Sequence, residues 1–475
     1  MTSDICSICS TDDPDKALWV QCEICGQWDH VTCVPLESLT DEDGLKTVKY
    51  PTSSRQIKRY SCSKHEEPVL ELRRRAVTKR KMEEADAPKS TPKRQGLRRK
   101  KQVDYISLNE GEAKRLKDEH PHVAPFLACF KQWENTTNVM RSSELEQQFE
   151  DIKNPLKVLD PENSGMQVPL GPEGRLLTVD GVTKFLGDEY PVDVMDVQSQ
   201  QNSNWTMLQW NDYFTHQTSD TRDRIRNVIS LEVSDVGKFS KELRRPQIVE
   251  SKDLVNLVWD RIPDDTERPK VTKYVLMSVK NAYTDFHLDF AGTSVYYKVV
   301  SGGKKFILFP PTAHNLHAYT QWCASTHQNL IFLGDELENG IAMELKAGDL
   351  FMIPCGYIHA VYTPEDSLVI GGNFLTLRDL ETQLQIVEIE RRTKVPKKFT
   401  FPQFDVVMGK TAEWLLTCGD EDAARLSSTQ LEVLIDFLSD ARAKYRPVKF
   451  STKRDVVKGL KTELEKKAKD STNPC

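Results

Sequence analysis

The feature that most constrains this 475-residue sequence is a set of eight cysteine and histidine residues within its first 65 positions. They form four pairs with two residues between partners: Cys6 and Cys9, Cys22 and Cys25, His30 and Cys33, Cys62 and His65. A pair with this spacing directs two side chains at one metal ion, and a tetrahedral zinc site needs two such pairs. Because so short a segment cannot stabilise itself with an apolar core alone, the spacing predicts two structural zinc sites.

The composition and the first residues of the sequence indicate in which cellular compartment the protein functions. The net charge is −6, the mean hydropathy is −0.53, and the sequence has no apolar run long enough to span a bilayer. Its beginning, Met-Thr-Ser-Asp-Ile-Cys, lacks the basic and apolar regions of a signal peptide. We therefore expect an intracellular protein without a membrane partner, in which thiols stay reduced and bind metal.

Charge is distributed unevenly along the chain. Residues 71–101 contain 13 Lys and Arg and four Asp and Glu, a local net charge of +9, so the remaining residues carry −15. This composition is typical of a solvated linker, which we place at residues 69–102, after a zinc-binding segment at residues 1–68. The same cations would also attract DNA phosphates and could act as a nuclear-import signal, so nucleosomal DNA is a possible partner.

The pattern becomes globular from residue 103 onward. Residues 166–200 and 270–376 contain short β-rich runs separated by Gly and Pro, which favour a barrel or sandwich. Residues 377–445 carry helical periodicity, whereas the basic tail at 446–475 is expected to be frayed. The sequence thus predicts an α+β fold, with a β domain and helical lead-in at 103–395 and a helical region with a basic tail at 396–475.

A second metal site is predicted in the β-rich region. His287 and Asp289 are two residues apart, so on a strand both side chains project from one face. His359 opens a later strand after a Pro-Cys-Gly turn, which is how a cupin-type barrel brings a third ligand across its mouth. Two imidazoles and one carboxylate leave three coordination positions open, as in non-haem Fe(II) oxygenases that use a 2-oxo acid.

Two further residues favour an oxygenase over another metalloenzyme. The far carboxylate of a 2-oxo acid needs a cation and a hydroxyl group, which Lys304 and Thr284 can supply. A zinc hydrolase could use the same three ligands, but it would not need a buried Lys and Thr at that distance.

The order of the eight ligands in the first segment, with one central histidine, resembles the PHD finger. That resemblance implies interleaved sites, with Cys6, Cys9, His30 and Cys33 at one zinc ion and Cys22, Cys25, Cys62 and His65 at the other. His65 stands where the family usually has cysteine, and imidazole is a competent zinc ligand.

Two tryptophans extend the resemblance to the PHD finger. Trp19 and Trp28 look like the cage residues of PHD fingers that bind trimethylated lysine 4 of histone H3, where aromatic faces attract the methylated ammonium. The alternative is a purely structural zinc module without a ligand of its own.

The stretch from Thr284 to Tyr297 is similar to JmjC-domain lysine demethylases. Further similar segments are DVMDVQ at 193–198, FLGD at 332–335, PCGYIHAVY at 354–362 and GGNF at 371–374. Together they cover roughly residues 150–395. A PHD finger followed by JmjC looks like the fungal histone demethylases that act on mono- and dimethylated lysine 36 of histone H3.

The JmjC resemblance implies a double-stranded β-helix barrel that binds Fe(II) and 2-oxoglutarate. The implied residues are His287, Asp289 and His359 for iron, Thr284, Lys304 and Tyr297 for 2-oxoglutarate, and Asn373 near the metal and the methyl group. One departure is Leu257, which lies where the family often has asparagine two residues before a tryptophan, here Trp259.

The implied activity is demethylation of the histone H3 tail in the nucleus, by hydroxylation of an N-methyl group and release of formaldehyde. Two other functions remain open at this point. The chain could be a JmjC hydroxylase that acts on a non-histone substrate, or a non-catalytic chromatin adaptor.

Overall fold

The computed structural model contains two compact units, residues 1–98 and 99–475, which we treat separately. The described residues are 6, 8–9, 18–25, 27–35, 39–40, 57–65, 69–72, 119–134, 138–199, 201–417 and 426–472. Most of the predicted basic linker and the start of the helical lead-in, residues 73–118, therefore lie outside the described residues.

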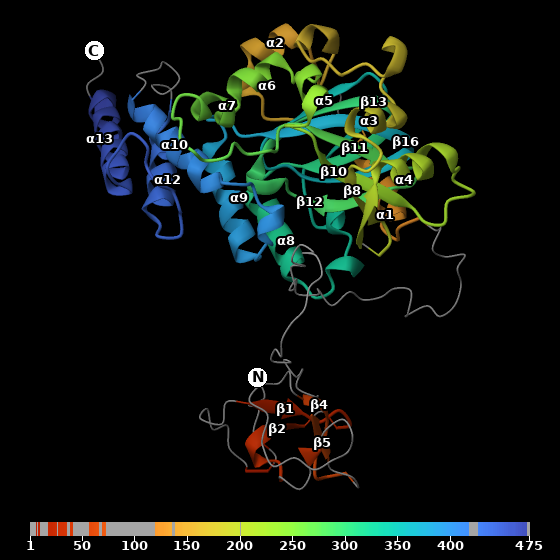
Figure 1. Cartoon of the computed structure of the whole chain (residues 1–475). Helices are drawn as coiled ribbons and strands as arrows, with labels where there is room; N and C mark the ends of the chain where they lie inside the picture. Colours follow the sequence, from red (N-terminus) through yellow and green to blue (C-terminus); the bar gives the residue numbers. More distant parts are fainter. Residues whose placement is uncertain are drawn as a thin grey trace, which may run out of the picture. The chain divides into compact units, whose positions relative to one another are not determined.

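The N-terminal unit consists of short strands around a small core (Figure 1). Strands β1 (Trp19–Gln21) and β2 (Trp28–His30) form an antiparallel pair that leads into the 3-10 turn η1 (Val31–Cys33). A second sheet has the order β3-β5-β4, formed by Leu39–Thr40, Val69–Leu72 and Ile57–Ser61. Among the described residues of this unit, one small cluster is buried, which includes Val20, Val31, Leu39 and Leu70 together with the zinc ligands Cys22 and Cys62.

The C-terminal unit is built on one eleven-stranded sheet, whose two longest strands are β13 (Ser294–Phe309) and β16 (Ile358–Phe374). These two strands pair with each other along nearly their whole length. The strands that add to β16 are β11 (Tyr274–Ser278) and β12 (Tyr283–His287), and those that add to β13 are β14 (Ile341–Lys346) and β15 (Leu350–Ile353). The remaining strands are β10 (Arg226–Glu232), β8 (Pro191–Asp196), β9 (Asn202–Thr206), β7 (Leu156–Val158) and β6 (Val139–Met140).

Strand β13 is longer than expected from the sequence, which favoured short β-rich runs separated by Gly and Pro; Gly302 and Gly303 lie within β13. The structure instead continues the strand through both glycines, with shifts of register beside them. Gly302 has a φ of +72°, and a Cβ atom there would lie 2.1 Å from the carbonyl oxygen of Asp366. The two glycines thus let β13 approach β16 closely. They form a bulge in β13 and do not end the strand.

Helices precede, interrupt and follow the sheet. Those before and within the sheet region are α1 (Val123–Gln132), α2 (Ser142–Gln147), α3 (Val179–Leu186), α4 (Met207–Asn211), α5 (Gly237–Glu242), α6 (Gln247–Lys252), α7 (Leu254–Trp259) and α8 (Ala313–Ala324). Those after it are α9 (Leu380–Arg392), α10 (Phe404–Thr417), α12 (Ser428–Ser439) and α13 (Lys453–Thr472). Helices α9, α10, α12 and α13 share one apolar core with α7, so the C-terminal helices pack directly on the part of the chain that precedes the central strands.

The expectation of a frayed C-terminal tail was wrong for residues 453–472, which form α13. The charged character of this segment concealed an apolar stripe in which Val456, Leu460 and Leu464 follow one another at intervals of four residues. Val456 and Leu460 are completely buried against the other C-terminal helices. Their burial accounts for a stable helix in a sequence that is otherwise rich in lysine.

No helix within the described residues is long and apolar enough to cross a bilayer. The α+β class and the barrel-forming sheet that the sequence predicted are confirmed.

Candidate functional site

Strand pairing brings the three predicted iron ligands together at one end of the sheet. His287, the last residue of β12, lies directly opposite His359 on β16. Asp289 follows two residues later, at the start of the turn η9 (Phe290–Gly292). The ligand atoms of the three side chains lie within 4.8 Å of one another, and Asp289 Oδ2 is 3.9 Å from His359 Nε2. One metal ion can therefore contact all three.

Both histidines are oriented by the same local hydrogen bond. His287 Nδ1 lies 2.8 Å from the carbonyl oxygen of Asp285, and His359 Nδ1 lies 3.0 Å from that of Tyr357. Because a carbonyl oxygen can only accept, Nδ1 carries the proton and Nε2 keeps its lone pair for a metal ion. Burial, together with the neighbouring His287, lowers the pKa of His359 to about 4, so this imidazole is neutral at physiological pH. The donor set thus fits Fe(II).

Lys304 lies inside the barrel, on the face of β13 that also carries Phe306. It is almost fully buried, and its Nζ donates a hydrogen bond to Thr363 Oγ1 at 2.8 Å. Burial lowers the pKa of Lys304 to about 7. Among the described residues, the hydrogen-bond partner of Lys304 is the Thr363 hydroxyl and no carboxylate acts on it, so an anion that entered the barrel would relieve the cost of burying a charged ammonium.

Thr363 is a contact that sequence reasoning missed. It lies four residues after His359 on the same strand, so both side chains project from one face of β16. The two-residue period of a strand, counted onward from His359, could have identified it.

Thr284 lies on β12 opposite Val361 of β16, three residues before His287. Its hydroxyl accepts a hydrogen bond from the amide of Asn227 at 3.4 Å, and Asn227 in turn accepts one from Ser278 Oγ at 2.6 Å. Asn227 on β10 was also missed, because no local motif marks an asparagine on a separate strand.

The last two predicted residues lie on the central strands. Tyr297 is buried on β13 directly opposite Gly371, and burial raises the pKa of its phenol above the usual range, so it stays protonated. Asn373 is buried on β16, and its amide donates to Thr293 Oγ1 at 2.8 Å. The orientation of this amide is therefore fixed by the residue that ends the turn η9 and precedes β13.

Leu257 packs away from the barrel interior. It lies on α7 and contacts the cluster formed by Val258, Ile262 and Trp414 of α10. The departure from the family pattern at Leu257 therefore lies at the contact with the C-terminal helices. The asparagine that contacts the predicted 2-oxoglutarate residue Thr284 is Asn227, on another element.

The zinc ligands of the N-terminal unit gather in two groups of four. One group is Cys6, Cys9, His30 and Cys33, and the other is Cys22, Cys25, Cys62 and His65; the ligand atoms within each group lie within 4.8 Å of one another. The structure therefore interleaves the four pairs as the resemblance to PHD fingers implied.

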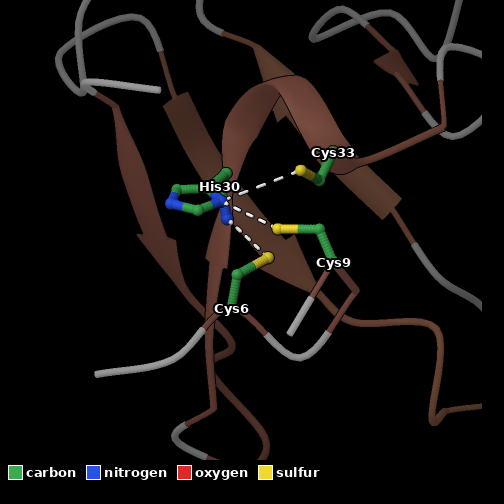
Figure 2. A group of neighbouring side chains, drawn as sticks. All are labelled: Cys6, Cys9, His30 and Cys33. Atoms are coloured by element: carbon green, nitrogen blue, oxygen red, sulfur yellow. Dashed lines mark hydrogen bonds between the residues drawn. The ribbon is translucent and has the colours of Figure 1, made fainter. Parts of the chain in front are cut away.

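In the first group the three cysteine side chains point toward His30 (Figure 2). Cys9 Sγ is 3.3 Å and Cys33 Sγ 3.8 Å from His30 Nδ1, and the backbone N–H of His30 donates to Cys6 Sγ at 3.3 Å. Sulfur and nitrogen atoms this close to one another fit a tetrahedral zinc ion.

The second group includes the unusual ligand His65. Its Nε2 is buried and has no hydrogen-bond partner among the described residues, which fits a nitrogen that binds metal. Although burial opposes the shift, backbone N–H groups around Cys22 lower the pKa of its thiol to about 6, which favours the thiolate that zinc requires. Cys25 Sγ and Cys62 Sγ are 3.6 Å apart.

The backbone register in β1 and β2 positions the two predicted cage tryptophans. Trp19 lies opposite His30, and Trp28 lies opposite Gln21. The indole of Trp28 is 37% exposed and available to a ligand. The side chain of Trp19 lies outside the described part of the structure, so the two-walled cage stays a prediction.

The comparisons agree with this geometry. A family model described as "JHD1, PHD-type zinc finger" matches residues 5–66, and one described as "Jumonji helical domain" matches residues 378–472. The JmjC domain-containing histone demethylation protein 1 of Kluyveromyces lactis is 52% identical over 97% of this chain and 98% of its own length. The chain belongs to the JmjC domain-containing histone demethylation protein 1 family.

Other relatives have the same or a related name. The histone demethylation protein 1 of Saccharomyces cerevisiae is 48% identical over 96% of this chain and 98% of its own length. Lysine-specific demethylase 2A of Xenopus tropicalis is 39% identical over 68% of this chain but only 28% of its own length. The resemblance to PHD–JmjC histone demethylases is confirmed, and the PHD family supports zinc in the N-terminal unit.

The unusual eighth ligand provides a test of the zinc sites. We expect His65→Ala to lower the zinc content from about two ions per chain to about one, because three ligands do not close a tetrahedral structural site. His65→Cys should retain both ions, since a thiolate can take the same position. Metal analysis of the purified proteins measures the difference, and an unchanged zinc content in His65→Ala would show that His65 is not a ligand.

Proposed function

We propose that this chain is an Fe(II)- and 2-oxoglutarate-dependent demethylase that acts on mono- and dimethylated lysine 36 of histone H3. The observation that carries the proposal is the convergence of His287, Asp289 and His359, with both Nε2 atoms available to one metal ion. The names of the relatives support histone demethylation, and the order of PHD finger and JmjC domain supports the finer assignment. When bound, iron with 2-oxoglutarate and O₂ supplies the oxidation of an N-methyl carbon.

The protein's own residues hold and orient 2-oxoglutarate in this proposal. Lys304 provides the cation for the carboxylate that lies farther from the metal, and its hydrogen bond to Thr363 fixes the ammonium in the barrel. Thr284 provides the hydroxyl, held in place by Asn227, and Tyr297 donates from its protonated phenol. Because these groups are buried and oriented before the cosubstrate arrives, little reorganisation accompanies binding.

The substrate side of the site follows from charge and packing. The amide of Asn373 is fixed by Thr293, which ends the turn that begins at Asp289, and in this proposal Asn373 contacts the methylated ammonium. The negative charge outside the basic linker suits a basic histone tail. Hydroxylation of the N-methyl group gives a hydroxymethyl group on the lysine nitrogen, which decomposes to formaldehyde and a lysine with one methyl group fewer.

We place this activity in the nucleus, with the basic linker as a contact for nucleosomal DNA.

The test of this function is formaldehyde release from a histone H3 peptide dimethylated at lysine 36. We expect His287→Ala to abolish release because it removes one of three metal ligands. His314→Ala, which changes an exposed histidine outside the site, should retain it. Undiminished release from His287→Ala would contradict the proposal.

Two further measurements test the other functions, namely the mass of candidate protein substrates and the binding of iron and 2-oxoglutarate. A mass gain of one oxygen on a non-histone protein, without demethylation of any histone peptide, would favour a JmjC hydroxylase. Failure of the chain to bind iron and 2-oxoglutarate would favour a non-catalytic chromatin adaptor.

We further propose that the PHD finger binds the histone H3 tail at trimethylated lysine 4. Support comes from Trp28, which is exposed although it adjoins the metal ligand His30, and from the register that places Trp19 on the neighbouring strand. An exposed indole held by a zinc-bound strand is a suitable wall for a trimethylammonium group.

We expect Trp28→Ala to weaken binding of a trimethylated lysine 4 peptide by about tenfold or more, since one good cation–π contact is worth ~1–2 kcal/mol. Ile24→Ala is the matched control, because Ile24 is an apolar side chain of the same unit that is 66% exposed. Fluorescence anisotropy with labelled peptide measures both. Equal affinities of the Trp28→Ala and original proteins would exclude the cage and leave a structural zinc module.

A further inference from the structure

The turn that follows Asp289 has an unusual backbone. Ala291 lies in the left-handed region with a φ of +51°, and Gly292 follows with a φ of +61°. A residue with a Cβ atom adopts this conformation at a cost, and it persists only where the surroundings hold it. Since Asp289 begins this turn, whatever holds Ala291 also sets the direction of the Asp289 carboxylate.

Glu390 on α9 holds the turn from outside the sheet. Its Oε1 accepts the backbone N–H of Ala291 at 2.7 Å. Burial raises the pKa of Glu390 to about 7. Because water has little access to this side chain, its hydrogen bond from the backbone N–H of Ala291 contributes to its stabilisation. Helix α9 begins at Leu380, within the segment that matches the Jumonji helical domain.

Ile386 lies one helical turn before Glu390 on the same face of α9 and is completely buried. A Cβ atom on Gly292 would lie 2.5 Å from Ile386 Cδ1. A Cβ atom on Gly356, which has a φ of +77° in the turn before His359, would lie 2.9 Å from the same Cδ1 atom. Ile386 thus fits between two glycine turns, one beside each of two metal ligands, and only glycine leaves room for it.

We propose that Glu390 is a positioning residue of the metal site: through Ala291 it fixes the turn that aims Asp289 at the metal, while Ile386 sets this turn relative to the one that precedes His359. The proposal rests on the proposed function, since it assumes that His287, Asp289 and His359 bind one metal ion. It gives the helical domain a direct part in the site, because its first helix supplies both contacts.

The test measures metal affinity without turnover. Mn(II) is titrated into the zinc-loaded full-length protein, and free Mn(II) is followed by electron paramagnetic resonance. We expect Glu390→Ala to weaken binding about tenfold, at the lower end of the losses that follow removal of a partner behind a metal ligand. Glu390→Gln should bind as the original protein does, because the amide oxygen still accepts the N–H of Ala291.

Two further variants separate positioning from charge and from folding. Glu390→Asp keeps the charge but is one methylene shorter, so it should bind Mn(II) as weakly as Glu390→Ala. Glu388→Ala removes a carboxylate from the same helix that pairs with Arg391, Arg392 and Arg442, and it should leave affinity unchanged. Thermal unfolding followed by circular dichroism accompanies each titration.

Each outcome distinguishes the inference from the proposed function. If the original protein binds no Mn(II) outside its zinc sites, the proposed function fails. If it binds Mn(II) and Glu390→Ala and Glu390→Asp bind equally well, the positioning role is overturned. Equal weakening in Glu390→Gln or in Glu388→Ala would also overturn it, because the effect would then follow charge or helix stability. Should Glu390→Ala fail to fold, the contrast between Glu390→Asp and Glu390→Gln decides.

Discussion

The pairing of β12 with β16 is the constraint on which the rest of the site depends. Along this pair Thr284 faces Val361 and His287 faces His359, so three steps on β12 match two steps on β16. The extra residue forms a bulge, and it brings both His287 and Thr284 into line with the partner strand. A slip of one residue would turn His287 to the other face and would separate the histidines.

The same short-range hydrogen bond prepares both histidines for a metal ion. Each ring donates from Nδ1 to the carbonyl oxygen two residues earlier, at Asp285 and at Tyr357. No distant side chain is needed to fix these tautomers, because the strand itself supplies the acceptor. Asp289 differs, since it lies at a turn after the strand, and its orientation depends on contacts from α9.

The sequence predicted those parts of the sites that short spacings define. The four zinc-ligand pairs have spacings that only a few architectures share, and His287, Asp289 and His359 lie at strand and turn positions with a stated geometric consequence. Asn227 and Glu390 could not be found in this way, because each reaches the site from an element distant in sequence and belongs to a common residue type. The helix α13 was missed because its lysines obscured Val456 and Leu460.

In the proposed function, one metal ion held by His287, Asp289 and His359 offers open coordination positions to 2-oxoglutarate. The most direct measurement is visible absorbance after Fe(II) and 2-oxoglutarate are added to the protein without oxygen, because a 2-oxo acid that chelates Fe(II) produces a charge-transfer band. The account predicts a band that saturates at about one iron per chain beyond the zinc and is absent from His359→Ala. The absence of the band from the original protein, or its persistence in His359→Ala, would contradict the account.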